Sequence, residues 1–509
     1  MPPTDTLPLV IDNQQSRWRN WHQTVDTPVG EWLTVWNADP NRSSLAGYQG
    51  TTQGLKDLIR RALTEDRSIR AHGGTWSFGP VAATDGILLN TQPLNYRFPI
   101  AGGDVHPTHA GGPLVFVQCG MSVADLNHYL DAKQLALPTC GASNGQTIAG
   151  AVSTGTHGAA FKIGAMQDFV RAIHLVPSPD ESIWLEPASR RATNDDLAAR
   201  VGARLETSDD LFKAALVSFG SFGLIHGLLL EVAPTFFLQI WRKEMPLDAA
   251  MWSAIANLDF SGLDLPGADG REPDHFQIVI NPYDEQRRGV VTVMYRSPTR
   301  PPGSTAPSIG GRWSQGDSAL EAIGLVTDLF PDLTGPLSKA LEKIAQSKIE
   351  NVCGRPGQVF RDTTTRGKAA GAGLGVRLDQ VEKAIGIARA RAVAIGAPAL
   401  LAIRLVKQTD ATLGFTRFGP ATAVIDLDGA QSNRQKRFFS ETFAALENEG
   451  VEYTFHWGKL NEVSPARMQR MYGAGRVQAW LDARRTVLPT PALRRAFAND
   501  FTDQAGLSA

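Results

Sequence analysis

The sequence predicts an α+β protein with two domains, and three observations lead to this fold class. Strand-like and helical segments follow one another through the first half of the chain, where helices are expected over 51–64 and from Ser122 onward. Residues 168–187 alternate and turn like a β-hairpin. Beyond about residue 240 the pattern changes, and a second domain is placed at about 236–450.

The second half is expected to alternate longer helices and strands. The predicted segments are helices over 318–350, 378–398 and 433–450, and strands over 399–407 and 418–429. A loop rich in Pro, Gly and Ser occupies 300–316. Gly-Ala-Pro and Gly450 supply the stop signals of the last two helices.

The composition is that of an ordinary soluble globular protein. Hydrophobic residues make up 42% of the 509 residues and charged residues 20%, with a formal net charge of −1. This balance gives no electrostatic reason to expect nucleic acid or an acidic membrane surface as a partner. The N-terminus lacks the features of a signal peptide, and three cysteines are too few for a disulfide framework. A soluble, cytoplasmic protein without a metal site is expected.

Two runs of glycine and small polar residues carry most of the functional information. They are RAHGGTWSFGP at 70–80 and TCGASNGQTIAGAVSTGTHG at 139–158. Small residues let a ligand approach the main chain, and free N–H groups in turns form a concavity for anions. Neither run contains lysine, so the main chain would hold an anion such as the pyrophosphate of a dinucleotide. For either run alone, close packing of a compact loop is the structural alternative.

The two runs resemble the pyrophosphate loops of the vanillyl-alcohol oxidase-type (PCMH-type) FAD-linked oxidoreductases. SFGSFGLIHGLLLEV at 218–232 is similar to the strand that closes the FAD domain in that family. HWGK at 456–459 and FANDFTDQAGL at 497–507 resemble the C-terminal segment of aldonolactone, alditol and flavin-linked cholesterol oxidases.

The resemblance implies a PCMH-type fold with two domains. Residues 1–235 would form the FAD-binding domain, 236–450 a substrate-binding cap, and 451–509 a segment that returns to the FAD domain. The FAD contacts implied by the resemblance lie in the two loops and the closing strand: Arg70, Gly73, Gly74, Thr75, Trp76, Ser77, Thr139, Gly141, Gln146, Thr147, Gly150, Ser153, Thr154, Thr156, His157, Gly158 and Ile225. For His157 we expect hydrogen bonding within its loop.

The implied activity is FAD-dependent oxidation of a CH–OH group. In this family an alcohol carbon gives hydride to the flavin while the hydroxyl proton is removed. The substrate would be a small alcohol, lactone, polyol or sterol-like molecule, and the electron acceptor would be oxygen or another acceptor. Lys459 is the candidate for a cation near the flavin. His456 would pack or hydrogen-bond beside it, with a structural histidine as the alternative.

The cap strand at 399–407 resembles one that carries an acid-x-Arg pair facing the flavin. Arg404 matches the arginine, but the acid position is Ala402, which departs from the pattern. Arginine is a poor base because its pKa lies above 12. Asp426, Glu452, His456 or the face around Arg417 could compensate, and the sequence does not select among them.

Trp76 stands where many relatives carry a histidine bonded covalently to the flavin. An indole offers no nucleophilic ring nitrogen, so non-covalent FAD is expected, with the Trp76 ring packed near the dimethylbenzene edge. His72 is expected to be structural; His72 or Cys140 would be the alternative attachment points.

Two further functions stay open at this point. The missing acid at Ala402 suits a flavin-dependent oxidative cyclisation, elimination or coupling reaction. The same scaffold could also serve a non-catalytic ligand-binding protein.

Overall fold

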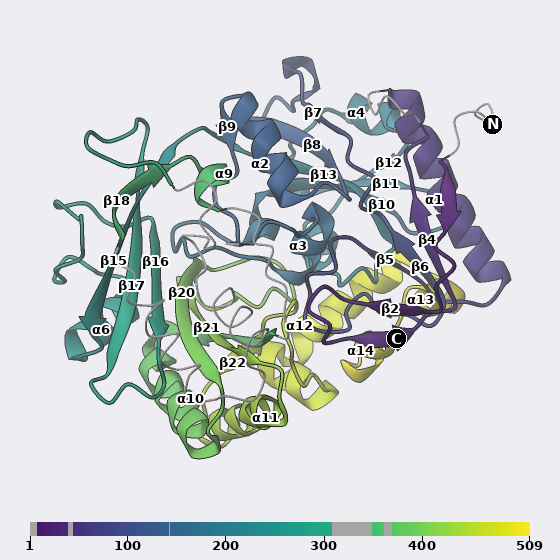
Figure 1. Cartoon of the computed structure of the whole chain (residues 1–509). Coiled ribbons are helices and arrows are strands. Elements are labelled where there is room, and N and C mark those ends of the chain that lie inside the picture. The colour runs from purple at the N-terminus through teal and green to yellow at the C-terminus, as the bar shows by residue number, and fades with distance from the viewer. Residues whose placement is uncertain (1–7, 39–43, 142, 308–348, 361–368) are drawn as a thin grey trace.

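The computed structural model describes residues 8–38, 44–141, 143–307, 349–360 and 369–509. Figure 1 shows two groups of β-sheet side by side, one built from the purple and blue part of the chain and one from the teal and green part. No helix among the described residues combines the length and apolar character needed to span a bilayer.

The first group begins with a four-stranded sheet in the order β1-β4-β6-β5. Its strands are β1 (Val10–Asp12), β4 (Glu31–Val35), β5 (Ile69–His72) and β6 (Ile87–Asn90). Helix α1 (Leu45–Thr64) crosses between β4 and β5 and starts earlier than predicted, because the Ser44 side chain accepts a hydrogen bond from the Gly47 N–H and caps it. The first glycine run leaves the end of β5.

A small hairpin lies between β1 and β4 in the chain and was not predicted. It consists of β2 (Arg17–Arg19) and β3 (Asp26–Pro28). The turn between these two strands carries His22, which reaches the cavity described below.

A six-stranded sheet in the order β12-β11-β10-β13-β8-β7 completes this part. Its strands are β7 (Arg97–Pro99), β8 (Leu114–Gln118), β10 (Val170–Val176), β11 (Ile183–Glu186), β12 (Arg204–Thr207) and β13 (Leu224–Glu231). The accompanying helices are α2 (Val123–Ala132), α3 (Ile148–Thr154), α4 (Asp195–Arg200) and α5 (Asp209–Leu216), and β9 (Leu135–Ala136) pairs with β14 (Ala233–Pro234). The predicted hairpin at 168–187 is confirmed, since β10 and β11 pair in antiparallel register.

The second group is an eight-stranded sheet in the order β18-β15-β17-β16-β20-β21-β19-β22. Its strands are β15 (Phe237–Pro246), β16 (His275–Ile280), β17 (Arg288–Ser297), β18 (Ile349–Gly354), β19 (Ala369–Arg377), β20 (Ala399–Lys407), β21 (Ala421–Ala430) and β22 (Tyr453–Phe455). The helices of this part are α6 (Ala249–Asn257), α9 (Pro356–Val359), α10 (Val381–Ile395) and α11 (Asn433–Asn448).

Most of the elements predicted for this half are confirmed. The strand predicted over 399–407 is β20, and the helices predicted over 378–398 and 433–450 are α10 and α11. The helix predicted over 318–350 lies outside the described residues up to residue 348, and its end is strand β18. Strand β22 pairs with β19, so the start of the segment predicted to return to the first domain belongs to the cap sheet.

The rest of that segment consists of helices α12 (Pro465–Val487), α13 (Pro491–Ala496) and α14 (Asp500–Gln504) (Figure 1). Helix α12 contacts α5 and α13 contacts α1, so both helices lie against the helices of the first group. The indole N–H of Trp480 donates to the Val217 carbonyl, and Arg484 Nε donates to the Ser221 carbonyl. The C-terminal segment therefore contacts the cap sheet through β22 and the first group through the residues after it.

Candidate active site

One large cavity lies between the two glycine runs and the inner face of the eight-stranded sheet. It encloses about 1870 Å³ of space outside the protein atoms, the open solvent at its mouth included. Its lining runs from both glycine runs to Arg404 and Lys459 of the cap side, so one space joins the two parts of the chain.

The first glycine run forms one wall as a tight, strained loop. A Cβ placed on Gly73 would lie 1.8 Å from Thr147 Oγ1, so no other residue fits there without displacing the second run. Thr75 has a φ of +57°, a left-handed conformation that costs a β-branched residue energy. Within the described chain, the N–H groups from Gly74 to Ser77 donate no hydrogen bond. They therefore form a concavity suited to an anion.

The second glycine run packs directly on the first. A Cβ on Gly145 would lie 2.2 Å from Trp76 Nε1, so the Trp76 ring rests on the bare main chain of Gly145. Trp76 also stacks on Trp21, with ring centroids 5.4 Å apart. The two runs thus form one continuous cradle of main chain and indole.

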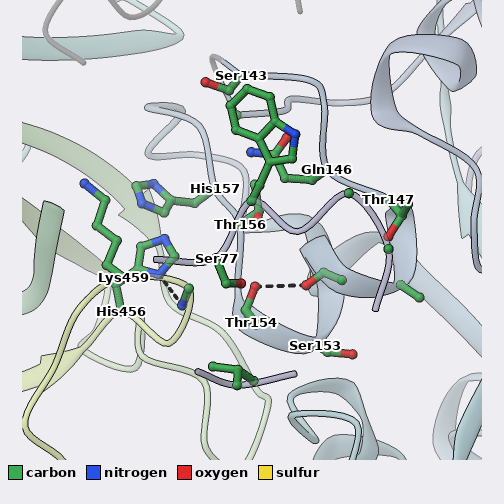
Figure 2. A pocket seen from close by; sticks show the side chains of 18 of the residues that line it. Ser77, Ser143, Gln146, Thr147, Ser153, Thr154, Thr156, His157, His456 and Lys459 are labelled. Atoms are coloured by element: carbon green, nitrogen blue, oxygen red, sulfur yellow. Dashed lines mark hydrogen bonds between the residues drawn. The ribbon is translucent and has the colours of Figure 1, made fainter. Parts of the chain in front are cut away.

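Hydroxyl groups line the same cradle. Figure 2 shows Ser77, Ser153, Thr154 and Thr156 around the pocket, with Thr154 Oγ1 donating to the Gly150 carbonyl at 2.9 Å. Neutral donors and open main-chain N–H groups, without a lysine in the loops, suit the pyrophosphate of FAD. The residues present therefore fit the cofactor that the sequence implied.

The predicted cofactor residues line this cavity with two exceptions, Arg70 and Thr139. Arg70 is buried, and its guanidinium donates to the carbonyl oxygens of Val81, Phe219, Gly220 and Phe497. Thr139 is buried too, and its hydroxyl bonds to His275 Nε2 at 3.0 Å. The polar groups of Arg70 and Thr139 are hydrogen-bonded to other parts of the protein. Both side chains therefore stabilise the cradle without lining the cavity.

The inner face of the cap sheet brings charged side chains to the other end of the cavity. Arg404 on β20 forms an ion pair with Asp426 on β21. Lys459 Nζ lies 2.8 Å from Asp426 Oδ1 and 2.8 Å from Asp428 Oδ1. These four side chains are buried, and Arg404, Asp426 and Lys459 line the cavity. Opposite charges packed this closely compensate one another's loss of hydration.

Alternating glycines of β19 leave the space for this charged group. A Cβ on Gly371 would lie 2.5 Å from Asp428 Oδ1, and one on Gly373 would lie 3.0 Å from the Lys459 side chain. Residues two apart on a strand share a face. The segment AAGAGLGVR at 369–377 thus keeps that face free for the charges, a signal that the sequence prediction did not use.

Two neutral histidines stand beside Lys459 (Figure 2). Burial and the nearby cations lower the pKa of His157 to about 3, and they lower the pKa of His456 well below its usual range. His157 Nδ1 lies 2.8 Å from the Gly158 carbonyl oxygen and donates to it, so its Nε2 carries the lone pair. His456 Nδ1 accepts from the Gly458 N–H, so its Nε2 carries the hydrogen. Two residues of the cavity lining thus supply one hydrogen-bond acceptor, His157 Nε2, and one donor, His456 Nε2–H.

The remaining candidates for a base or for a flavin attachment point differ in where they lie. Glu452 and Arg417 are not among the lining residues, whereas Asp426 is. His72 has both ring nitrogens engaged, with the Trp32 N–H and with the Gly73 carbonyl. Burial raises the pKa of the Cys140 thiol to about 12, which leaves it protonated and unreactive.

Sequence reasoning missed several lining residues because they come from segments without a motif. His22 stacks on Phe78 with ring centroids 4.0 Å apart, and burial and Lys459 lower its pKa to about 4. Gln277 on β16 lies opposite Thr292 on β17, and His275 is two residues before Gln277; all three line the cavity. Only the pairing of the cap strands shows that they share a face with Arg404.

Comparison with known proteins agrees with this geometry. Residues 48–184 match the family described as FAD binding domain. The chain is 25% identical to an L-gulono-1,4-lactone dehydrogenase of Mycobacterium tuberculosis over 460 residues, which is 88% of this chain and 92% of that protein. It is 23% identical to the L-gulonolactone oxidase of Bos taurus, over 56% of this chain and 55% of that protein.

Among solved structures, a cholesterol oxidase from B. sterolicum superposes with a TM-score of 0.68 at 15% identity, over 99% of this chain and 98% of that one. The matches to three curated relatives span only 30%, 55% and 57% of their lengths. Together the findings define the class: residues 48–184 are an FAD-binding domain, and the whole chain has the fold of the cholesterol oxidase. The cofactor of this chain is FAD, held by the domain that contains residues 48–184.

Proposed function

We propose that the protein is an FAD-dependent oxidase or dehydrogenase that oxidises the CH–OH group of a small alcohol, lactone, polyol or sterol-like substrate. The observation that carries this proposal is the shape of the cavity. Its one wall is the cofactor cradle of the two glycine runs, and its other wall presents Arg404, Lys459 and two neutral histidines from the cap side. A substrate between the two walls would be in contact with cofactor and charged groups at once.

The protein's own groups suit the handling of a hydroxyl group. When bound, FAD supplies a two-electron acceptor for the substrate's hydride. Arg404 and Lys459 place positive charge where an alkoxide develops and stabilise it in a site of low dielectric constant. The lone pair of His157 Nε2 and the hydrogen of His456 Nε2 can accept from and donate to the same hydroxyl group. These four side chains are buried, which limits their contact with bulk water.

The gulonolactone-oxidising relatives and the cholesterol oxidase neighbour favour this activity over the two further functions. A cyclisation or coupling reaction was suggested by the acid missing at Ala402, and Asp426 supplies a carboxylate directly opposite that residue on the neighbouring strand. Oxidation of a CH–OH group is therefore the function that the site supports best.

The test is anaerobic reduction of the purified holoprotein. A panel of neutral alcohols, polyols, aldonolactones and a sterol is mixed with it, and the flavin absorbance band is followed. Bleaching by at least one of them, with the matching carbonyl product, is expected. A protein that takes up no FAD, or one whose FAD no substrate reduces, would contradict the proposal. Repeating the reaction with oxygen and with an artificial dye identifies the electron acceptor.

We also propose that the FAD is bound non-covalently. Trp76 lies in the cradle at the position where many relatives carry the attached histidine, and the ring nitrogens of His72 are engaged elsewhere. Acid precipitation should release all of the flavin into the supernatant. Flavin fluorescence that stays with the denatured chain would overturn this.

A cytoplasmic location is part of the same proposal. The three cysteines, Cys119, Cys140 and Cys353, are free in the structure, as a reducing compartment permits. Fractionation of the native host with an antibody against the protein tests it.

A further inference from the structure

The acid that the strand β20 lacks is present on the neighbouring strand. Ala402 and Asp426 are directly opposite each other in the antiparallel pairing of β20 with β21. Residues opposite each other in such a pair share one face of the sheet, with Cβ atoms about 4.5–5.5 Å apart. A carboxylate at position 426 therefore stands on the same face as one at position 402 would, one strand away.

Asp426 connects the two candidate cations of the site. Its Oδ1 accepts from Lys459 Nζ at 2.8 Å, and Arg404 forms its ion pair with Oδ2. Asp426 is 0% exposed, so water does not screen either interaction. Arg404 comes from β20, whereas Lys459 follows β22, the last strand in the order of the same sheet. Asp426 is the group that contacts both.

The structure also restricts what Asp426 can do. Both carboxylate oxygens already face a cation, so neither is placed to take a proton from a substrate hydroxyl. Gln277 Oε1 accepts from Arg404 Nε at 3.2 Å and orients that guanidinium from the other side. The arrangement is that of a carboxylate which fixes two cations in relation to one another.

We propose that Asp426 is the positioning residue of the site and replaces, from strand β21, the acid absent at position 402. This rests on the proposed function, in which Arg404 and Lys459 stabilise a developing alkoxide. Without the Asp426 charge, the two cations repel each other and move apart, and the site carries one more positive charge. The reaction rate falls and small anions bind more tightly.

The experiment moves the carboxylate from one strand to the other. Asp426→Asn, Ala402→Asp and the double variant are compared with wild type as holoproteins. Asp379→Asn is the control, because its side chain is 60% exposed on the cap and pairs with Arg377, which is exposed as well. The values measured are kcat and KM for the substrate that reduces wild type, together with the dissociation constant of acetate by calorimetry.

For Asp426→Asn we expect kcat to fall about 100-fold, the effect of misplacing a group that stabilises transition-state charge. Acetate should bind about tenfold more tightly, since the site gains a net positive charge at low dielectric constant. Adding Ala402→Asp to Asp426→Asn should restore at least about tenfold of kcat and weaken acetate binding again. Recovery of kcat and of wild-type acetate binding in the double variant would show that the site needs the negative charge and not the packing of the Asp426 side chain.

An Asp426→Asn variant with unchanged kcat and unchanged acetate binding would overturn the inference. If Asp426→Asn does not fold, the double variant decides. A folded double variant with activity supports the inference, and a folded but inactive one contradicts it. Acetate binding does not require turnover, so it tests the role of Asp426 even if the wild-type protein oxidises no alcohol. Absence of any alcohol oxidation by wild type would refute the proposed function and leave the acetate result to decide on Asp426.

Discussion

Arg70 Nη1 lies 2.9 Å from the carbonyl oxygen of Phe497, although 427 residues separate them in the chain. The same guanidinium also donates to carbonyl oxygens of Val81, Phe219 and Gly220. Arg70 opens the first glycine run, so this one side chain ties the cradle to the closing strand and to the returning C-terminal segment. Burial lowers its pKa to about 9, which leaves it charged at neutral pH.

Arg70→Met is expected to destabilise the fold strongly. The substitution leaves buried carbonyl groups without donors, each at a cost of about 1–3 kcal/mol. Arg70→Lys should lie between wild type and Arg70→Met, because an ammonium group supplies fewer donors. Urea unfolding measures the free energy, and Arg485→Met, at an exposed ion pair, should change it by no more than about 0.5 kcal/mol. A stable Arg70→Met protein that has lost its FAD would instead make Arg70 a cofactor contact.

Gly73→Ala and Gly145→Ala should both release FAD. Their Cβ atoms would lie 1.8 Å from Thr147 Oγ1 and 2.2 Å from Trp76 Nε1, so the two runs must separate. Overpacking of this kind costs about 1–3 kcal/mol, and the distortion falls on the cradle itself. The flavin-to-protein absorbance ratio after gel filtration is the measurement. Gly103→Ala, whose Cβ meets nothing within 4 Å, is the matched control and should keep full FAD content.

Lys459→Gln should lower kcat about 100- to 1,000-fold, as loss of one preorganised donor does elsewhere. It should also destabilise the protein, because Asp426 and Asp428 lose a shared cation in a buried site. Adding Asp428→Asn removes one of those charges. The double variant should therefore regain thermal stability while its kcat stays low. Recovery of both together would show that Lys459 acts only through the fold.

Acidification from pH 6.5 to 4 should destabilise the protein. Seven histidines are buried, and burial lowers the pKa to about 4 for His22 and His72 and to about 3 for His157, His174 and His275. In this window the unfolded chain binds protons that the folded chain does not, so stability falls with pH by up to about 1.4 kcal/mol per pH unit for each histidine.

Asp168 changes the stability in the opposite direction over the same pH range, because burial raises its pKa to about 7 and protonation then favours the folded state. The buried histidines outnumber this one carboxyl group, so their effect is expected to dominate. Melting temperatures between pH 7 and 4.5 test this balance. A melting temperature that is constant or rises on acidification would be inconsistent with neutral buried histidines.

Local features, such as helices, hairpins and glycine-rich loops, could be predicted from the sequence. Features that depend on which strands pair with one another could not. The helix from Ser122, the hairpin at 168–187 and strand β20 follow from capping residues and periodicity, and the structure has them where they were expected. The two glycine runs could be recognised because a main chain that closely approaches another segment or a ligand leaves no space for a Cβ atom, so glycine is required there. Arg70 was assigned to the cofactor for its neighbours in sequence, yet its partners are remote carbonyl groups.

Asp426 shows why the rest of the site could not be predicted. Its role depends on lying opposite Ala402 and beside Lys459, and strand order in the cap sheet does not follow from any single strand. The glycines of β19 were visible in the sequence, but their meaning depends on which strands lie beside them. The unpredicted hairpin with His22 reaches the cavity for the same reason, through contacts between segments distant in sequence.

Anaerobic titration of the holoprotein tests the central claim most directly. The flavin absorbance of wild type and of Lys459→Gln is followed while a neutral alcohol or lactone is added without oxygen. Stoichiometric bleaching of wild type, with one carbonyl product per FAD and bleaching at least about 100-fold slower in the variant, is the predicted result. Flavin that no CH–OH substrate reduces, or that both proteins reduce at the same rate, would contradict the account.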